Sequence, residues 1–329
     1  MRLPVGSGAG GGLTILGPRS NATLQRLVCL GLACACLILV SAPAAAARVA
    51  VVLSSDSSPY QEVYQVVRSL LNASQHEPSR LYADKLTAPA LEGASLVIAV
   101  GVRAAEALAS HPNQSPVLTV LVPRAWYLKT GRSRLSDSGR RNVSAIYLDQ
   151  PFERQVQLIR LALPEVQLVG VLLSADQGEQ LGELDAALRT QQLGLLPVTL
   201  SEEERLIASL ENVLSGADVL LAVADPQVFN RSTAQSLFLT SYRYRTPIMG
   251  YSVSLTRAGA LLSLHTSPAQ IGQQAAEAVI ASLQGGSVRL PPPAYPAYFS
   301  ISINEQVARS LGYTLPTEAE LEKRLGDRL

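Results

Sequence analysis

Short apolar runs alternate with helical patterns along most of the chain. Residues 49–53 form a continuous apolar run with a β-branched bias, and a polar loop, residues 54–59, follows directly. A strand buried on both faces, followed by a helix start, has this pattern. The order recurs in the next segments, which are a helical pattern at 59–72, a run at 96–100 ending at Gly101, a helix at 104–109 and a run at 117–122 ending at Pro123. This order predicts a parallel sheet covered by helices.

A second series of the same kind follows a stretch of low apolar content, residues 129–142. Its expected strands are 143–148, 168–173, 198–200, 218–223 and 247–250, and its expected helices are 152–163, 181–191, 206–214 and 233–242. A run at 260–264, a helix at 268–283, Gly and Pro breaks at 285–293, a strand at 298–303 and a last helix near Glu305 complete the chain. The pattern predicts two α/β lobes, each a parallel sheet flanked by helices, with a chain that passes between them more than once. We place 48–142 and about 262–286 in the first lobe, and 143–261 and about 287–329 in the second.

The first 47 residues differ from the rest. They contain three arginines, no acidic residue and all three cysteines, and the apolar core at 27–40 runs into Ala45-Ala46-Ala47. This is the pattern of a signal peptide, and the run is shorter than the ~20 residues that a membrane-spanning helix needs. We expect cleavage after Ala47 and a periplasmic protein without disulfides, with a retained membrane anchor as the alternative.

Composition narrows the class of function. With 16% charged and 47% hydrophobic residues the chain has the composition of a folded protein, and 27 Lys and Arg balance 26 Asp and Glu. Nucleic-acid binding requires clustered positive charge, so no nucleic-acid partner is expected.

Candidate ligand contacts come from the loops that follow the strands. Open parallel sheets bind ligands outside the carboxyl ends of their strands. We therefore expect ligand contacts from the first lobe at Ser54, Asp56, Tyr60 and Gly101, and from the second at Asp225, Tyr251 and Ser252. The alternative is ordinary loop chemistry, because Ser and Asp favour helix N-caps and Asp225 precedes a proline.

Catalytic patterns are weak in this sequence. His76, His111 and His265 lie far apart, and none has metal-ligand spacing. The segment 250–254 (GYSVS) resembles a nucleophile elbow but has Ser in place of the closing Gly. We assign no catalytic residue, no metal ligand and no cofactor, and an enzyme would need residues that only the fold brings together.

Several segments carry a resemblance to a known family: 218–230 (DVLLAVADPQVFN), 240–252 (TSYRYRTPIMGYS), 257–261 (RAGAL), the helix at 268–285 and residues 303–316. Together they resemble the ABC-transporter substrate-binding protein family whose best-known members take up tryptophan or tyrosine. The likeness covers about residues 95–316. The chain departs from the family pattern at Val122-Pro123-Arg124-Ala125, where an Asp-Pro-Val-like turn is usual, and in the first loop, 54–60, which lacks a His-Pro segment.

The resemblance implies a type I periplasmic binding fold, with two α/β lobes, three crossing segments and a hinge that closes on a solute. It also implies a small polar ligand, an inner-membrane ABC permease and its ATPase as partners, and no enzymatic activity. The alternative is a periplasmic sensor module that passes ligand occupancy to a signalling partner, because the same fold serves both.

Overall fold

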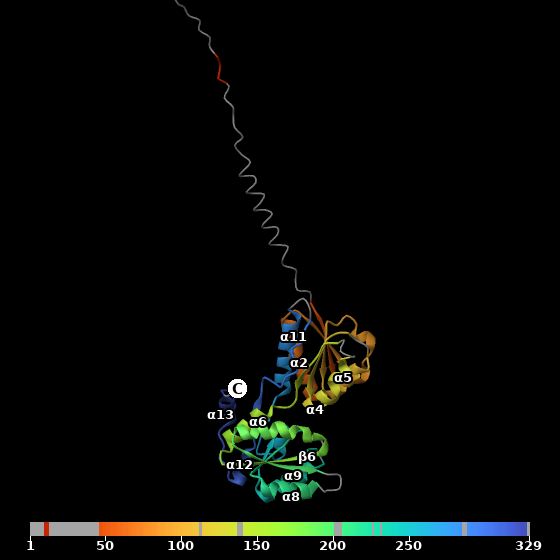
Figure 1. Cartoon of the computed structure of the whole chain (residues 1–329). Coiled ribbons are helices and arrows are strands. Elements are labelled where there is room, and N and C mark those ends of the chain that lie inside the picture. The colour runs from red at the N-terminus through yellow and green to blue at the C-terminus, as the bar shows by residue number, and fades with distance from the viewer. Residues whose placement is uncertain are drawn as a thin grey trace, which may run out of the picture. The chain divides into compact units, whose positions relative to one another are not determined.

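The computed structural model describes residues 10–12, 46–111, 114–136, 141–200, 206–225, 227–230, 232–284 and 288–327. Residues Ala46–Leu329 form one compact unit, which is drawn in colour in Figure 1. The expected signal peptide lies outside the described residues except at 10–12, 46 and 47. Within the described part, no helix combines the length and the apolar character needed to cross a bilayer.

The first lobe is built on a five-stranded, fully parallel sheet. Its strands, in the spatial order β2-β1-β3-β4-β5, are Glu77–Tyr82, Arg48–Leu53, Leu96–Val100, Val117–Val122 and Val143–Tyr147. Alternate residues of β1 pack into two hydrophobic cores, one on each face of the sheet. Val51 packs with helices α2 (Ser58–Ala73) and α11 (Pro268–Leu283), and Val52 packs with α3 (Val102–Ala109) and α5 (Arg132–Leu135). Helices cover both faces, which explains the uninterrupted apolar run.

The second lobe is built on a six-stranded sheet of order β11-β10-β9-β8-β6-β7. In that order its strands are Ser300–Ile303, Leu262–His265, Ile248–Gly250, Val219–Leu221, Leu168–Ser174 and Gly194–Leu200. The core on one face includes residues of α6 (Phe152–Ala162), α7 (Leu181–Thr190), α12 (Glu305–Leu311) and α13 (Glu318–Gly326), and the core on the other includes α8 (Leu206–Gly216), α9 (Ala234–Tyr244) and α10 (Val253–Ala258). Figure 1 shows α8 and α9 beside this sheet. Two mainly parallel sheets flanked by helices confirm the predicted fold class.

The lobe boundaries differ from the sequence-based ones at three places. Strand β5 pairs with β4 and so belongs to the first sheet, whereas we had placed residues 143–148 in the second lobe. Strand β10 pairs with β9 in the second sheet rather than lying in the first lobe. Ala294 bridges to Ile146, and Val288 packs on the first core, so the start of the third crossing belongs with the first lobe. Hydrophobic periodicity identifies a strand but not the strand with which it pairs, so periodicity alone could not locate these boundaries.

Three elements also differ in kind. Strand β11 runs antiparallel to β10, although we expected parallel sheets. Strand β2 was not predicted, because its sequence (EPSRLY) is mostly polar, as an edge strand allows. The first residues of the stretch 129–142, whose low apolar content is typical of surface chain, form helical turns that bury Leu135.

Hydrogen bonds join the three segments that cross between the lobes. Gln150, after β5, donates from Nε2 to Oγ1 of Thr266, which follows β10 (2.5 Å). Thr266 in turn donates to the carbonyl of Tyr298 in the third segment (2.8 Å). Buried Arg154 donates to Oε1 of Gln150 (2.6 Å) and to the carbonyl of Pro296 (2.9 Å). These bonds form a hinge network.

Candidate ligand-binding cleft

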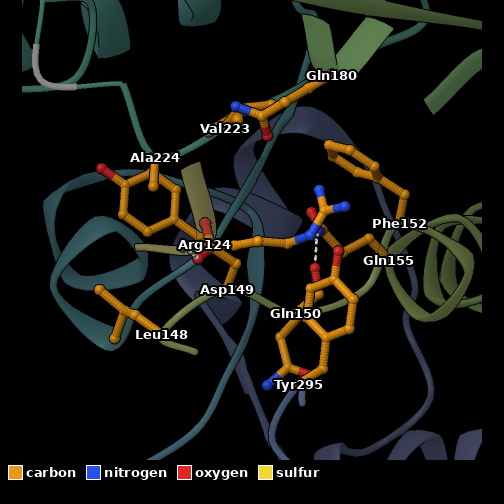
Figure 2. A pocket seen from close by; sticks show the side chains of 12 residues that line it. Arg124, Leu148, Asp149, Gln150, Phe152, Gln155, Gln180, Val223, Ala224 and Tyr295 are labelled. Atoms are coloured by element: carbon orange, nitrogen blue, oxygen red, sulfur yellow. Dashed lines mark hydrogen bonds between the residues drawn. The ribbon is translucent and has the colours of Figure 1, made fainter. Parts of the chain in front are cut away.

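A pocket lies between the two sheets, at the carboxyl ends of their strands. Its lining comes from both lobes and from two crossing segments, and consists of Arg124, Leu148, Asp149, Gln150, Phe152, Gln155, Gln180, Ala222, Val223, Ala224, Tyr251 and Tyr295 (Figure 2). The space inside this pocket is about 490 Å³ and includes solvent at its open side, and the centres of water-sized molecules can occupy only about 30 Å³ of it. The pocket is therefore narrow where the two lobes meet.

Arg124 extends across this pocket (Figure 2). It begins the short helix α4 (Arg124–Trp126) after β4, and its backbone N–H donates to Oδ2 of Asp149 (2.6 Å). Its guanidinium lies over the ring of Tyr295 (5.7 Å to the centroid) and donates two hydrogen bonds to Glu183 in α7 (2.9 and 2.8 Å). Burial by itself lowers the pKa of Arg124. The hydrogen bond and charge of Glu183, together with the neighbouring tyrosines, raise the pKa by more than burial lowers it. The net pKa is therefore above its ordinary value, and the guanidinium is charged.

Asp149 is the acidic side chain of the lining. Desolvation raises the pKa of this carboxyl, while the hydrogen bond from the Arg124 backbone and the Arg124 charge partly oppose the rise. Asp149 lies two residues after the end of the buried strand β5, in the place where open sheets carry ligand-binding groups.

Aromatic side chains from both lobes contribute to the lining. Tyr295 lines the pocket and continues behind it into a series of rings with Tyr147 and Tyr127, whose centroids are 5.5 and 5.8 Å apart. Burial raises the pKa of Tyr295 to about 12, so its hydroxyl is neutral at physiological pH. From the second lobe, Tyr251 packs edge-on against Phe229 (6.2 Å), and burial, followed by the charge of Asp225, raises its pKa. The pocket thus offers one cation, one carboxyl and neutral hydroxyls.

Of the predicted contacts, Tyr251 is the one that lines this pocket. Ser54 and Asp56 instead line a separate polar hollow of about 380 Å³ in the first lobe, beside Tyr82, Lys85 and Arg103. The hydroxyl of Ser54 is already used, because it donates to the Val100 carbonyl (2.8 Å) and accepts from the Ala104 N–H (3.0 Å).

Gly101 and Tyr60 lie close to Ser54. Gly101 precedes α3 with φ +88°, and a Cβ there would lie 2.5 Å from the Ser54 hydroxyl and 2.9 Å from the ring of Tyr60. The structure therefore brings three of the predicted first-lobe residues together through packing.

The remaining predicted residues of the second lobe have structural bonds. The carboxylate of Asp225, which is 1% exposed, accepts the N–H groups of Ser174 (2.7 Å) and Gln227 (2.9 Å). Ser252 is the N-cap of α10 and accepts from the Leu255 N–H (3.2 Å). The capping role that we considered as the alternative is thus present at Ser252, and Asp225 uses both oxygens to hold backbone.

Sequence reasoning did not select Arg124, Asp149 or Tyr295. Asp149 follows a predicted buried strand, so the rule that selected Asp56 would have found it once that strand was placed in the first sheet. Arg124 lies where the chain departs from the family pattern, and that departure was its signal. Tyr295 sits in a proline-rich segment without any pattern. Across the described ranges, no three His, Cys, Asp or Glu side chains are grouped so that they could hold a metal ion.

Known structures share this fold. One is an ABC domain in complex with L-Trp from Streptococcus pneumonia, which is 18% identical over 84% of this chain and 98% of that chain (TM-score 0.57). A conserved domain protein from Vibrio cholerae is 22% identical over 84% and 98% (TM-score 0.59). The ligand-free, open structure of a substrate-binding protein with adhesive properties from Clostridium difficile is 14% identical over 83% and 97% (TM-score 0.65). These likenesses establish a type I periplasmic binding fold. No curated protein sequence matches the chain significantly.

The family model for ABC transporter substrate binding proteins matches residues 62–323, which is most of the chain and includes every strand of the two sheets except β1, together with the residues that line the cleft. The family resemblance drawn from the sequence is thereby confirmed. The chain belongs to the family of ABC transporter substrate-binding proteins.

Proposed function

We propose that this protein is the exported solute-binding component of an ABC importer, which closes on a small polar molecule and delivers it to an inner-membrane permease and its ATPase. The observation that carries the proposal is the cleft itself, where Arg124 and Asp149 face Tyr251 across the junction of two hinged lobes. Family membership supports the same reading. Such a protein binds its solute without turning it over.

The ligand is the first thing to determine. Mass spectrometry of small molecules released by denaturing freshly purified protein should find a bound solute, and L-Trp is the first compound to compare because a protein of the same fold was crystallised with it. Added back at a hundred times its Kd, the solute should stabilise the folded state by about 2.7 kcal/mol. A protein that releases no solute and is stabilised by none would contradict the proposal.

The position of the ligand can be tested with one hydroxyl. Tyr251→Phe removes the hydroxyl in the cleft and keeps the ring that packs on Phe229. If that hydroxyl bonds the ligand, affinity should fall up to about tenfold, which corresponds to about 0.5–1.5 kcal/mol for one hydrogen bond. Tyr244→Phe, an exposed tyrosine on α9, is the matched control and should leave affinity unchanged.

Delivery to a permease needs a cellular measurement. Deleting the gene should abolish uptake of the radiolabelled solute, and the Tyr251→Phe chain should restore it less well than the natural chain. Unchanged uptake together with loss of a solute-dependent transcriptional response would instead assign the protein to sensing.

We also propose export, from the arginine-flanked apolar core at 27–40 and the alanines that end it. N-terminal sequencing of protein from the producing cell should begin at or near Arg48. Intact residues 27–40 on membrane-bound protein would show a retained anchor instead.

A further inference from the structure

Among the ion pairs found in the described part of the chain, Arg124–Glu183 joins the two lobes. Arg124 extends from the end of β4 in the first lobe, and its partner Glu183 lies on α7, which packs on the second sheet. The other ion pairs found among the described residues each stay within one lobe: Arg134–Glu106, Arg189–Asp185, Arg243–Glu211, Arg309–Glu305 and Arg324–Glu320. Separating the lobes must therefore break the Arg124–Glu183 pair and none of these others.

The two partners are held differently. The backbone of Arg124 is fixed by Asp149, and its guanidinium lies over the Tyr295 ring, which belongs to the same side of the hinge. Arg124 lines the pocket with 26% of its side chain exposed, whereas the Glu183 side chain is 49% exposed and is not part of the lining. When the lobes part, the guanidinium stays at the cleft and the carboxylate leaves with α7.

A guanidinium held in this way matches an oxyanion. Its planar donors bind a carboxylate or a phosphate through two parallel hydrogen bonds, as the bonds of 2.9 and 2.8 Å to Glu183 show here. Enclosing the cation in a closed cleft without a partner would be costly. A solute that fills the cleft and moves Glu183 aside must supply an anion of its own.

Resting on the proposed function, we propose that Arg124 recognises an anionic oxygen group of the ligand, and that Glu183 occupies the place of that group when the cleft holds no ligand. Glu183 is then an internal competitor for the same guanidinium. The ligand class is a small molecule with a carboxylate or a phosphate.

The test uses small oxyanions as probes. Succinate and inorganic phosphate are titrated at constant ionic strength into the full chain, and binding is followed by the emission of Trp126, the only tryptophan, two residues from Arg124. Glu183→Gln should bind at least one probe about two- to fivefold more tightly than the natural chain, which is the range for losing one competing exposed ion pair. The two probes distinguish carboxylate from phosphate recognition.

Two further variants make the result specific. Glu305→Gln removes the acid of the exposed Arg309–Glu305 pair, changes net charge equally and should bind as the natural chain does. Arg124→Gln combined with Glu183→Gln should lose the whole gain, and Arg124→Lys, which keeps the charge without the fork, should recover only part of it. Melting temperatures of all variants confirm that they fold.

Three outcomes would overturn the inference: equal affinity in Glu183→Gln and the natural chain, a gain that persists without Arg124, or no binding of either probe by any variant. The proposed function fails separately. If the natural solute has no anionic group and binds equally well to Arg124→Gln, the inference is wrong and the proposed function stands. If the probes bind as expected but no cellular solute stabilises the protein, the proposed function is wrong and the inference stands.

Discussion

The side-chain amide of Gln150 donates to the hydroxyl of Thr266 over 2.5 Å, and so ties the first crossing segment to the second. The same hydroxyl donates to the Tyr298 carbonyl of the third crossing, and both Gln150 and Thr266 are buried. The Thr266 hydroxyl therefore connects all three crossing segments.

Replacing this hydroxyl should weaken the hinge. Thr266→Val keeps the shape of the side chain but leaves the Gln150 amide and the Tyr298 carbonyl without this partner, at a cost of about 1–3 kcal/mol in the free energy of unfolding. Urea unfolding measures the loss. Thr314→Val, at an exposed position, is the control and should change stability little. Equal effects at the two sites would show that the hinge bonds contribute nothing specific.

Gly101 should tolerate no side chain. Its φ of +88° is strained for any L-residue, and a Cβ would meet the Ser54 hydroxyl at 2.5 Å. We expect Gly101→Ala to destabilise the protein by about 1–3 kcal/mol. Gly182→Ala in α7, where a Cβ meets nothing within 4 Å, should be neutral or stabilising. A Gly101→Ala variant as stable as the natural chain would disprove the close packing.

The sequence was sufficient for the fold but not for the lobe boundaries. The apolar runs at 49–53, 96–100 and 168–173 are long and covered on both faces, so hydrophobicity alone identified them as strands. Which sheet a strand joins depends on pairing partners far away in the chain. That is why β5 was assigned to the wrong lobe although its own position was predicted correctly, and why the polar edge strand β2 was missed.

The site was predicted less well than the fold. The rule that ligands bind at the carboxyl ends of parallel strands identifies loops, but it does not identify which side chains of those loops face the cleft. Ser54 and Asp225 are at the expected strand ends, yet their oxygens bond the backbone. Arg124 reaches the cleft only because Asp149 fixes its helix start and Tyr295 supports its guanidinium. These partners are 25 and 171 residues away, and no local pattern announces them.

Asp225 is expected to act through stability. Its two carboxylate oxygens accept the N–H groups of Ser174 and Gln227, and an asparagine can replace only one of them as an acceptor. Asp225→Asn should therefore lower the free energy of unfolding by about 1–3 kcal/mol, the cost of a buried group left unsatisfied. A thermal melt in the absence of ligand measures this. An unchanged melting temperature with weakened ligand binding would instead restore Asp225 as a ligand contact.

His265 should make stability depend on pH. Burial lowers its pKa in the folded protein, although Glu322 and Glu318 partly oppose this, and its Nε2 lies 2.9 Å from the Ser302 hydroxyl. Below pH ~6.5 the unfolded chain binds a proton that the folded one does not, so stability falls as the pH drops through the unfolded value toward the folded one, by at most about 1.4 kcal/mol per pH unit.

His265→Gln removes this titration and keeps a polar partner for Ser302. Urea unfolding at pH 7.5 and 5.5 should therefore show a larger loss of stability on acidification in the natural chain than in His265→Gln. Identical losses would mean that His265 protonates equally in both states.

Closure on a solute is the central claim, and small-angle X-ray scattering tests it most directly. A single partly exposed ion pair such as Arg124–Glu183 shifts an equilibrium only a few-fold, so without ligand the protein should exchange between forms closed on this pair and open forms in which it is broken. Adding the solute identified by mass spectrometry to saturation should reduce the radius of gyration of the full chain, with a smaller reduction at the same sub-saturating concentration for Tyr251→Phe. A radius of gyration that does not change when the solute saturates its site would contradict the hinge and the proposed function together.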